Sequence, residues 1–436
     1  MTRNAIYCVC ILIFLLSACS SVPTGQPQVQ YHLALNQYDE AVRVLKSQAN
    51  LYGARNRLLY DLDLGLTLHY AGRYQESIKA FEQAKVEYGK RNTTSVSRAA
   101  LTWVLNDTTA SYRGEDFERV MINIFNAVNF AVLGDFEGAL VEARNGDREL
   151  ALINARYPDD KKNVYKEDGF ARLLMGIMYE ASGSRSDIND AWIEYARAYE
   201  IYKGDYARNY NLQVPSILRE NYLAAAEFMR DPRLGALKRE LGGSFPSIEE
   251  KKRKAEVYLI HYHGTSPTKY QAAVPIPIDG ILTPVAFPVY QEQFYPPASG
   301  SLKVVSSAGS FESSTELAEN IGPIAQLNLE NRRLRTIVKS AVRSGVRTAI
   351  EANQIENIED KHNRAAQWVG LGASVYNLVA EQADLRSWQT LPGEIRLGRL
   401  ILEPGEYDVF FRDQKLGHAN LKATDKKFFV VRTVFQ

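Results

Sequence analysis

Two histidines and a serine–lysine pair have spacings that could support chemistry in the C-terminal half. His261 and His263 alternate along a stretch rich in β-forming residues, so both would face one side of a strand and could share a metal ion. Two ligands do not make a metal site, and we favour histidines that simply pack. Ser266 and Lys269 have the spacing of a serine–lysine nucleophile, but Pro267 follows a strand instead of opening a helix, so we interpret this match as chance.

Other catalytic signatures are absent from the sequence. It contains no phosphate-binding glycine loop, no His-Glu-x-x-His motif and no cysteine-based metal motif. We therefore predict no catalytic residue, no metal and no cofactor, and we expect the chain not to be an enzyme.

Cys19 has the most specific chemical context. It follows a charge-free apolar run over residues 5–16 and ends the sequence Leu16-Ser17-Ala18-Cys19. This pattern is similar to the lipobox of bacterial lipoproteins, in which the cysteine thiol is acylated before the chain is cleaved in front of it. Two or more acyl chains anchor a protein stably, whereas one chain binds only marginally. The alternative is an ordinary secretory signal with a coincidental cysteine.

The start of the chain therefore predicts where in the cell the protein is located. We expect a signal peptide over residues 1–18, lipid on Cys19, and a flexible polar tether over residues 19–30. Ser20 follows the cysteine where an Asp would be expected for inner-membrane retention, which resembles the pattern sorted to the outer membrane of Gram-negative bacteria. The expected location is the periplasmic face of the outer membrane.

Composition excludes several classes of protein. The 436 residues include 52 Lys and Arg against 51 Asp and Glu, so the basic excess of a nucleic-acid binder is missing. No apolar run reaches the roughly 18 residues of a spanning helix. Cys8 and Cys10 lie in the predicted signal peptide, so loss of that peptide and acylation of Cys19 would leave no thiol for redox chemistry.

Residues 31–245 are predicted to form helical repeats. The best match to the tetratricopeptide pattern contains Leu64-Gly65, Gly72, Tyr74 and Phe81. Small residues in this pattern let paired helices approach, and aromatic residues fill the space between them. Weaker units lie around Tyr38, Gly134 and Gly176. Such a solenoid would offer a concave face to a peptide or a partner helix.

Two charged and aromatic segments are candidates for binding a partner. In the first, Tyr112, Arg113, Glu118 and Arg119 would face a groove; the alternative, which we favour, is a capped helix start with solvated ion pairs. The second consists of Arg386 and Trp388, where a helical insertion would rejoin the sheet. For Trp388 we favour a buried ring that fixes this junction over contact with a ligand.

Residues 255–436 are predicted to form a β-sandwich-like domain. The predicted strands cover residues 256–263, 301–306, 394–402, 407–411 and 428–435, and prolines between 275 and 288 favour short or edge strands. A helical hairpin is expected as an insertion at about 313–385, because apolar residues recur at helical spacing over 334–350 and residues 365–380 carry no charge. This insertion could pack on its own domain, form an oligomer or partner surface, or touch a membrane surface. Residues 251–254, Lys-Lys-Arg-Lys, are interpreted as a solvated domain boundary.

Four segments together resemble a known family. They are Tyr-Arg-Gly-Glu-Asp-Phe-Glu-Arg (112–119), Leu-Gly-Asp-Phe (133–136), Val-Glu-Ala-Arg (141–144) and Ala-Asp-Leu-Arg-Ser-Trp-Gln-Thr-Leu-Pro (383–392). They look like an uncharacterised family of bacterial lipoproteins with tetratricopeptide-like repeats. The resemblance covers most of the chain after the signal peptide and implies an address and an architecture but no activity.

The sequence thus predicts an α+β chain, with an all-α tetratricopeptide-like solenoid followed by a β-sandwich-like domain that carries a helical-hairpin insertion. The expected function is a non-enzymatic scaffold or adaptor for an envelope protein assembly, one version being a regulator of cell-wall synthesis. Expected partners are the outer membrane through the lipid, an envelope protein through the repeats, and a second copy of the chain through the insertion, but no nucleic acid. The alternative is a small-ligand binder or enzyme with a site where solenoid and β-domain meet, near His261, His263 or Arg386.

Overall fold

A computed structural model describes residues 26–92, 110–155, 165–278, 281–291, 293–298, 300–331 and 383–434. Cys19 and the predicted signal peptide lie outside these residues. The predicted tether is too long at its C-terminal end, because helix α2 begins at Gln26 and the side chains of Gln26 and Val29 are buried. Within the described residues, no helix has the length and apolarity needed to cross a membrane.

The N-terminal region is helical, as predicted. Successive helices joined by short turns pack as pairs, namely α5 with α6, α8 with α9, and α10 with α11, and each pair contacts the next. The helices are α2 (Gln26–Ala34), α3 (Tyr38–Ser47), α4 (Ala49–Tyr52), α5 (Arg57–Tyr70), α6 (Tyr74–Asn92), α8 (Asp116–Leu133), α9 (Phe136–Ala155), α10 (Gly169–Ser182), α11 (Arg185–Ile201), α12 (Ala207–Tyr210), α13 (Ser216–Met229), α14 (Leu234–Leu241) and α15 (Ile248–Lys251).

Glycines set the close approach within two of these pairs. A β-carbon on Gly65 of α5 would lie 2.6 Å from the ring of Phe81 on α6, and one on Gly176 of α10 would overlap the ring of Tyr195 on α11. The hydroxyl of Ser77 donates to the Gly65 carbonyl oxygen at 2.7 Å and joins α6 to α5. Small residues on one helix thus receive aromatic rings from the other.

The C-terminal region is rich in β-structure, as predicted, but its sheets do not form a closed sandwich. One sheet has the order β10-β1-β7-β6 with β1 and β10 parallel, another has the order β5-β4-β8-β9, and β2 and β3 form a separate hairpin. The strands are β1 (Ala255–His263), β2 (Thr268–Ile278), β3 (Ile281–Gln291), β4 (Ser301–Ser306), β5 (Gly309–Ser314), β6 (Glu316–Asn320), β7 (Glu394–Leu402), β8 (Gly405–Phe411), β9 (Gln414–Leu421) and β10 (Lys426–Thr433).

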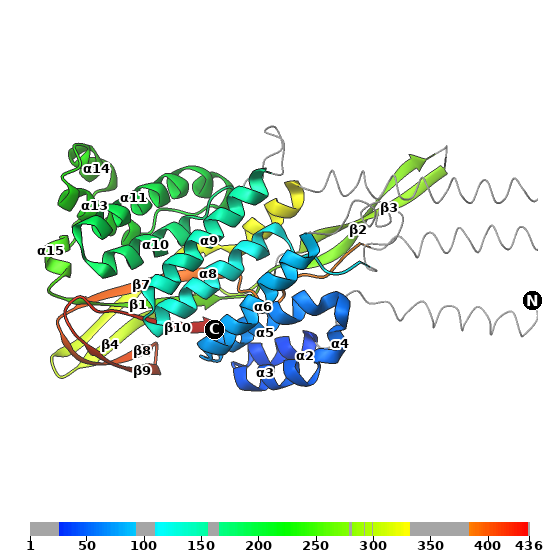
Figure 1. The fold of residues 1–436 in the computed structure, drawn as a ribbon, viewed down its shortest axis with the longest axis horizontal. Helices are drawn as coiled ribbons and strands as arrows, with labels where there is room; N and C mark the ends of the chain where they lie inside the picture. Colours follow the sequence, from blue (N-terminus) through cyan, green and yellow to red (C-terminus); the bar gives the residue numbers. More distant parts are fainter. Residues whose placement is uncertain are drawn as a thin grey trace, which may run out of the picture.

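Strand β1 lies at the centre of three layers. Every residue of β1 is buried, because helices cover one face of its sheet and the second sheet covers the other (Figure 1). On the helical face, Tyr258 and Tyr262 join the same hydrophobic core as the helices. On the opposite face, Val257 and Leu259 pack with Val304 of β4 in a smaller core between the two sheets. In a closed sandwich this outer face of the sheet would be exposed to solvent, whereas here the helices cover it.

The predicted insertion is shorter at both ends than its expected bounds of 313–385. Strand β6 lies inside those bounds and pairs with β7, residues 321–331 are helical, and residues 383–391 are not helical. The sequence Glu-Leu-Ala-Glu-Asn of β6 has few β-forming residues, so its pairing with β7 decides its conformation. Residues 332–382, which contain most of the predicted hairpin, lie outside the described residues.

Candidate functional site

The structure brings together four of the six residues predicted to bind a partner. Residues 383–391, here called the inner segment, form neither a helix nor a strand, contain a turn at residues 389–390, and lead into β7 (Figure 1). Arg386 and Trp388 of this segment are 2% and 0% exposed, and they meet Tyr112 and Glu118, which are 2% and 0% exposed. These four side chains therefore contact other parts of the same chain.

The remaining two predicted residues lie outside this cluster. Arg113 is exposed. Arg119 forms an ion pair with Glu149, and its guanidinium lies 5.0 Å from the centre of the Tyr88 ring.

Glu118 is the centre of the cluster. Its carboxylate accepts hydrogen bonds from the hydroxyl of Tyr112 at 2.6 Å, from the backbone N–H of Glu115 at 2.8 Å and from the backbone N–H of Trp388 at 2.8 Å. Glu115 and Glu118 form a capping box at the start of α8, so the helix start that we favoured from the sequence exists. The carboxylate is buried, however, and burial raises the pKa of Glu118 to about 7.

A second buried carboxylate, Asp63 on α5, holds the other end of the inner segment. It accepts hydrogen bonds from Tyr52 at 2.9 Å, from Gln26 at 3.1 Å and from the hydroxyl of Thr390 at 3.1 Å. The indole N–H of Trp388 in turn donates to the Thr390 hydroxyl oxygen at 2.7 Å. Burial raises the pKa of Asp63 to about 6. The sequence analysis missed Asp63, although an acid among the leucines of α5 was a usable signal.

Arg386 and Lys269 complete this inner-segment cluster. The guanidinium of Arg386 pairs with Asp384 at 2.7 Å, donates to Asn56 at 2.9 Å and lies 5.5 Å from the centre of the Tyr112 ring. Lys269 pairs with Glu115 at 2.5 Å and donates to the Arg386 carbonyl oxygen at 2.9 Å. Lys269, from the serine–lysine match, is therefore part of a buried structural ion pair.

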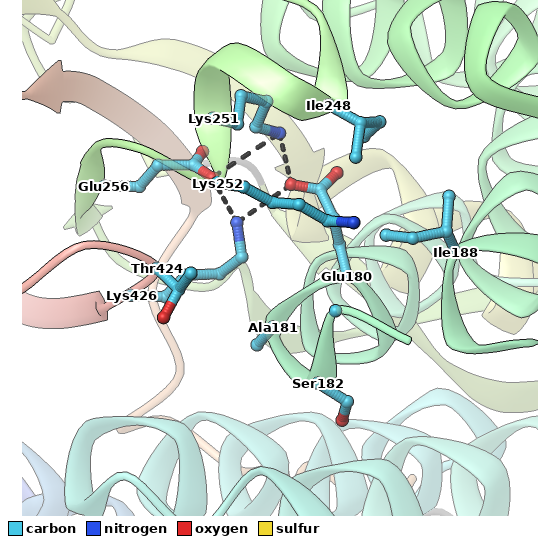
Figure 2. Close-up of a pocket in the computed structure, with 11 residues that line it drawn as sticks. Glu180, Ala181, Ser182, Ile188, Ile248, Lys251, Lys252, Glu256, Thr424 and Lys426 are labelled. Atoms are coloured by element: carbon cyan, nitrogen blue, oxygen red, sulfur yellow. Dashed lines mark hydrogen bonds and ion pairs between the residues drawn. The ribbon is translucent and has the colours of Figure 1, made fainter. Parts of the chain in front are cut away.

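A second cluster of buried charges joins the helices to the edge of the sheet. Figure 2 shows the ammonium groups of Lys251 and Lys426 between the carboxylates of Glu180 and Glu256, in an alternating arrangement that we call the lysine–glutamate ring. Lys426 lies 2.9 Å from Glu180, Lys251 lies 3.5 Å from Glu256, and the other two pairs are also in direct contact. Lys251, expected at a solvated boundary, is only 4% exposed, because the ring takes it into the interior.

Further polar side chains saturate the ring. Glu256 also accepts a hydrogen bond from Tyr258 at 2.7 Å and pairs with Arg399 at 3.3 Å, while Glu180 accepts one from Tyr195 at 3.0 Å. Burial opposes ionisation of Glu256, yet the surrounding cations hold its pKa well below the usual value. A cavity of about 320 Å³ adjoins the ring and lies where helices α10, α11 and α15 meet β1 and β10.

His261 and His263 lie side by side and are buried. The Thr433 hydroxyl is 2.7 Å from Nε2 of His261 and 2.8 Å from Nδ1 of His263, and Nε2 of His263 lies 2.7 Å from the Pro296 carbonyl oxygen. The Pro296 carbonyl oxygen can only accept, so Nε2 of His263 donates to it. With the proton on Nε2, Nδ1 of His263 accepts from the Thr433 hydroxyl, and the Thr433 oxygen accepts from Nε2 of His261. Burial lowers the pKa of His261 to about 3, consistent with a neutral ring. The described residues hold no group of three or more metal-ligating side chains.

The carboxylates of Asp63, Glu118, Glu180 and Glu256 all have partners within the chain, and each cluster joins segments that are far apart in the sequence. Their carboxylates and cations are committed to internal hydrogen bonds and ion pairs, which favours a structural role over chemistry on a substrate. Comparisons of the chain with protein-family models, with curated proteins and with solved structures found no match.

Proposed function

We propose that this chain is a non-enzymatic scaffold that is held at the periplasmic face of the outer membrane by lipid on Cys19 and binds an envelope protein through its helices. The sequence pattern around Cys19 supports the lipid anchor at the outer membrane, and the paired helices support a helical scaffold. The packing of Gly65 against Phe81 and of Gly176 against Tyr195 supports a divergent tetratricopeptide-like array.

The observation that carries this proposal is that the chain itself covers the inner face of the helices, which is the face turned toward β1 and the inner segment. The inner segment binds there through Asp63 and Glu118, and the ring of Trp388 packs 5.9 Å from those of Phe81 and Phe125. This face of the helices is thus already covered by another segment of the same chain. The partner would accordingly bind the outer surface of the helices.

The first helices offer an apolar outer surface for such a partner. Tyr31 on α2 is 63% exposed, Leu35 in the turn after α2 is 49% exposed, and Leu51 on α4 is 57% exposed. The backbone N–H of Leu35 donates to the Tyr31 carbonyl oxygen at 3.3 Å, so Leu35 lies one turn beyond Tyr31 at the end of α2. Exposed aromatic and aliphatic side chains of this kind are typical anchors of protein interfaces.

Photo-crosslinking in intact envelopes tests the proposal. A photoreactive amino acid at Tyr31 or Leu51 should give crosslinks to one envelope protein, and the same amino acid at Arg208, an exposed residue of α12, should not. Recovery of the chain without a crosslinked protein from both Tyr31 and Leu51 would contradict the proposal. A Cys19→Ser variant that still fractionates with the outer membrane would contradict the lipid anchor.

The cavity beside the lysine–glutamate ring favours a second candidate function. It lies where helices and sheet meet, and Lys252, Thr424 and Ile188 line it together with the ring (Figure 2). A small ligand bound there would be recognised by Lys252, whose side chain is 35% exposed. A metabolite that raises the Tm of the wild type but not of Lys252→Met would select this function. We rank it second because the buried charges of the ring already satisfy one another.

A further inference from the structure

A separate cavity is lined by two arginines whose Nε atoms have no hydrogen-bond partner among the described residues. It has a volume of about 510 Å³ and lies between the loop that precedes α13 and strands β6 and β7. Arg219 and Arg396 line it from opposite elements, together with Ser216 and Glu316. The two arginines come from parts of the chain that the sequence analysis did not connect.

Arg219 is the less satisfied of the two arginines. Its side chain is 34% exposed, and a nearby carboxylate, Glu220, lies 3.8 Å away. That carboxylate is in direct contact with Arg399, which competes for it. The Nε atom of Arg219 is buried and has no hydrogen-bond partner among the described residues. Leaving a buried donor without a partner is unfavourable, so the Nε–H of this guanidinium is available to donate to a bound anion.

Arg396 is fixed in place but keeps one donor free. Its guanidinium pairs with Glu394 at 3.1 Å and donates to the Thr315 carbonyl oxygen at 3.0 Å. These contacts hold the side chain, at 19% exposure, in one orientation toward β6. Its Nε atom is also buried without a hydrogen-bond partner in the described part of the chain. A held guanidinium loses less conformational entropy when it binds a ligand.

The cavity offers an anion buried N–H donors and not an excess of positive charge. Glu316 lines it with the two arginines, and Glu394 and Glu220 lie beside them, but the Nε atoms of Arg219 and Arg396 have no partner among the described residues. The Glu316 carboxylate accepts a hydrogen bond from the Ser216 backbone N–H at 2.6 Å. Glu316 therefore occupies one donor in the first turn of α13, whose N-cap residue Pro215 provides no side-chain hydrogen bond. The positive end of this helix adds to the field of the two arginines.

We propose that this cavity binds a small oxyanion, a carboxylate or a phosphate, between Arg219 and Arg396. A guanidinium group can donate two parallel N–H hydrogen bonds to two oxygen atoms of either anion. The feature shared by the two ligands is therefore a group of two or three oxygen atoms that both arginines can bind. The site is independent of the scaffold proposal, since it lies away from the inner segment and from the exposed residues of α2 and α4.

Calorimetric titration of the full chain at low ionic strength tests the site, with inorganic phosphate and succinate as separate probes. We expect saturable binding of at least one probe, and the probe that binds identifies the source of the anion. Arg219→Gln should weaken that binding at least tenfold. Arg208→Gln is the matched control, because Arg208 is exposed and pairs with Asp205 at 2.7 Å on the protein surface.

Two results would overturn the proposal. One is the absence of saturable binding by both probes. The other is an equal loss of binding in the Arg219→Gln and Arg208→Gln variants, which would mark a diffuse charge effect. Circular dichroism and Tm of both variants establish that they fold, and Arg396→Lys provides a second test that keeps the charge but removes the fork. Binding that survives both Arg219→Gln and Arg396→Lys would also contradict the site.

Discussion

The inner-segment cluster and the lysine–glutamate ring both join the helices to the C-terminal region, but their carboxylates have different partners. Glu118 and Asp63 accept hydrogen bonds from hydroxyl, amide and backbone N–H donors that carry no charge. Glu180 and Glu256 lie directly against lysine ammonium groups. Burial alone raises the pKa of a carboxyl group, and only the ring supplies enough positive charge to reverse the effect.

This difference predicts two kinds of sensitivity. The ring should be intolerant of losing a charge, because the remaining partner would be left ionised and buried. The inner-segment cluster should respond to pH near neutrality, because its carboxyl groups titrate at about 6 and about 7. The following predictions separate the two, from the largest expected effect to the smallest.

Removing one charge of the ring should have the largest effect. Lys426→Met leaves Glu180 and Glu256 with less compensation, and we expect the free energy of unfolding to fall by about 3–5 kcal/mol. Lys427→Met on the same strand is the control, since Lys427 is exposed and its replacement should change stability by less than about 0.5 kcal/mol. Urea denaturation measures both, and equal stabilities would show that the ring contributes nothing to the join.

Adding a methyl group at a glycine that contacts an aromatic ring of the paired helix should disturb each cluster. Gly176→Ala displaces Tyr195 from Glu180 of the ring, and Gly65→Ala displaces Phe81 from Trp388 of the inner segment. We expect each variant to lose about 1–3 kcal/mol of stability. Gly89→Ala on α6 meets no atom within 4 Å and should instead gain up to about 1 kcal/mol. Three similar values in thermal unfolding would argue against close packing at these glycines.

The pH dependence of stability should reveal Glu118. Its folded-state pKa of about 7 lies above the unfolded value of about 4.3, so its contribution is present at low pH and is lost as the pH rises through 7. Between about pH 4.3 and pH 7 the wild type should therefore lose stability relative to Glu118→Gln, with a limiting slope of roughly 1.4 kcal/mol per pH unit, and the difference should level off above pH 7. Glu137→Gln, at an exposed residue of α9, should run parallel to the wild type. A constant difference between wild type and Glu118→Gln would place the titration elsewhere.

Breaking an exposed ion pair should cause the smallest change in the free energy of unfolding. Arg73, just before α6, pairs with Glu76 in the first turn of α6 at 2.7 Å, where solvent screens the interaction. Arg73→Ala should change the free energy of unfolding by less than about 1 kcal/mol, and added salt should reduce the difference further. A loss as large as that of Lys426→Met would remove the distinction between buried and exposed pairs.

Local patterns in the sequence predicted much of the fold. The β-forming run at residues 256–263 and the predicted strands at 394–402 and 407–411 coincide with strands β1, β7 and β8. Gly65 and Phe81 indicated helix packing because both positions follow one repeat pattern. In each case the signal lies within a few turns of helix or a single strand, where periodicity decides the structure.

The join between the two regions was not predictable in the same way. Lys251 belongs to a run of basic residues that usually faces solvent, and its burial depends on Glu180 and on Lys426 far along the chain. The inner segment has no periodicity at all, since its conformation depends on Asp63 and Glu118 on the helices. Long-range partners of this kind leave no local pattern in a single sequence.

Thiol labelling at Ser387 tests most directly whether the inner segment permanently fills the helical face. Ser387 is 2% exposed and its hydroxyl has no hydrogen-bond partner in the described structure, so Ser387→Cys should be tolerated in a chain whose Cys8, Cys10 and Cys19 are replaced by serine. A maleimide should label this cysteine only at denaturant concentrations that also abolish the helical circular dichroism, whereas Ser310→Cys on exposed β5 should label at once. Rapid labelling at Ser387→Cys without denaturant would show that the segment leaves the helices and that their inner face is open to a partner.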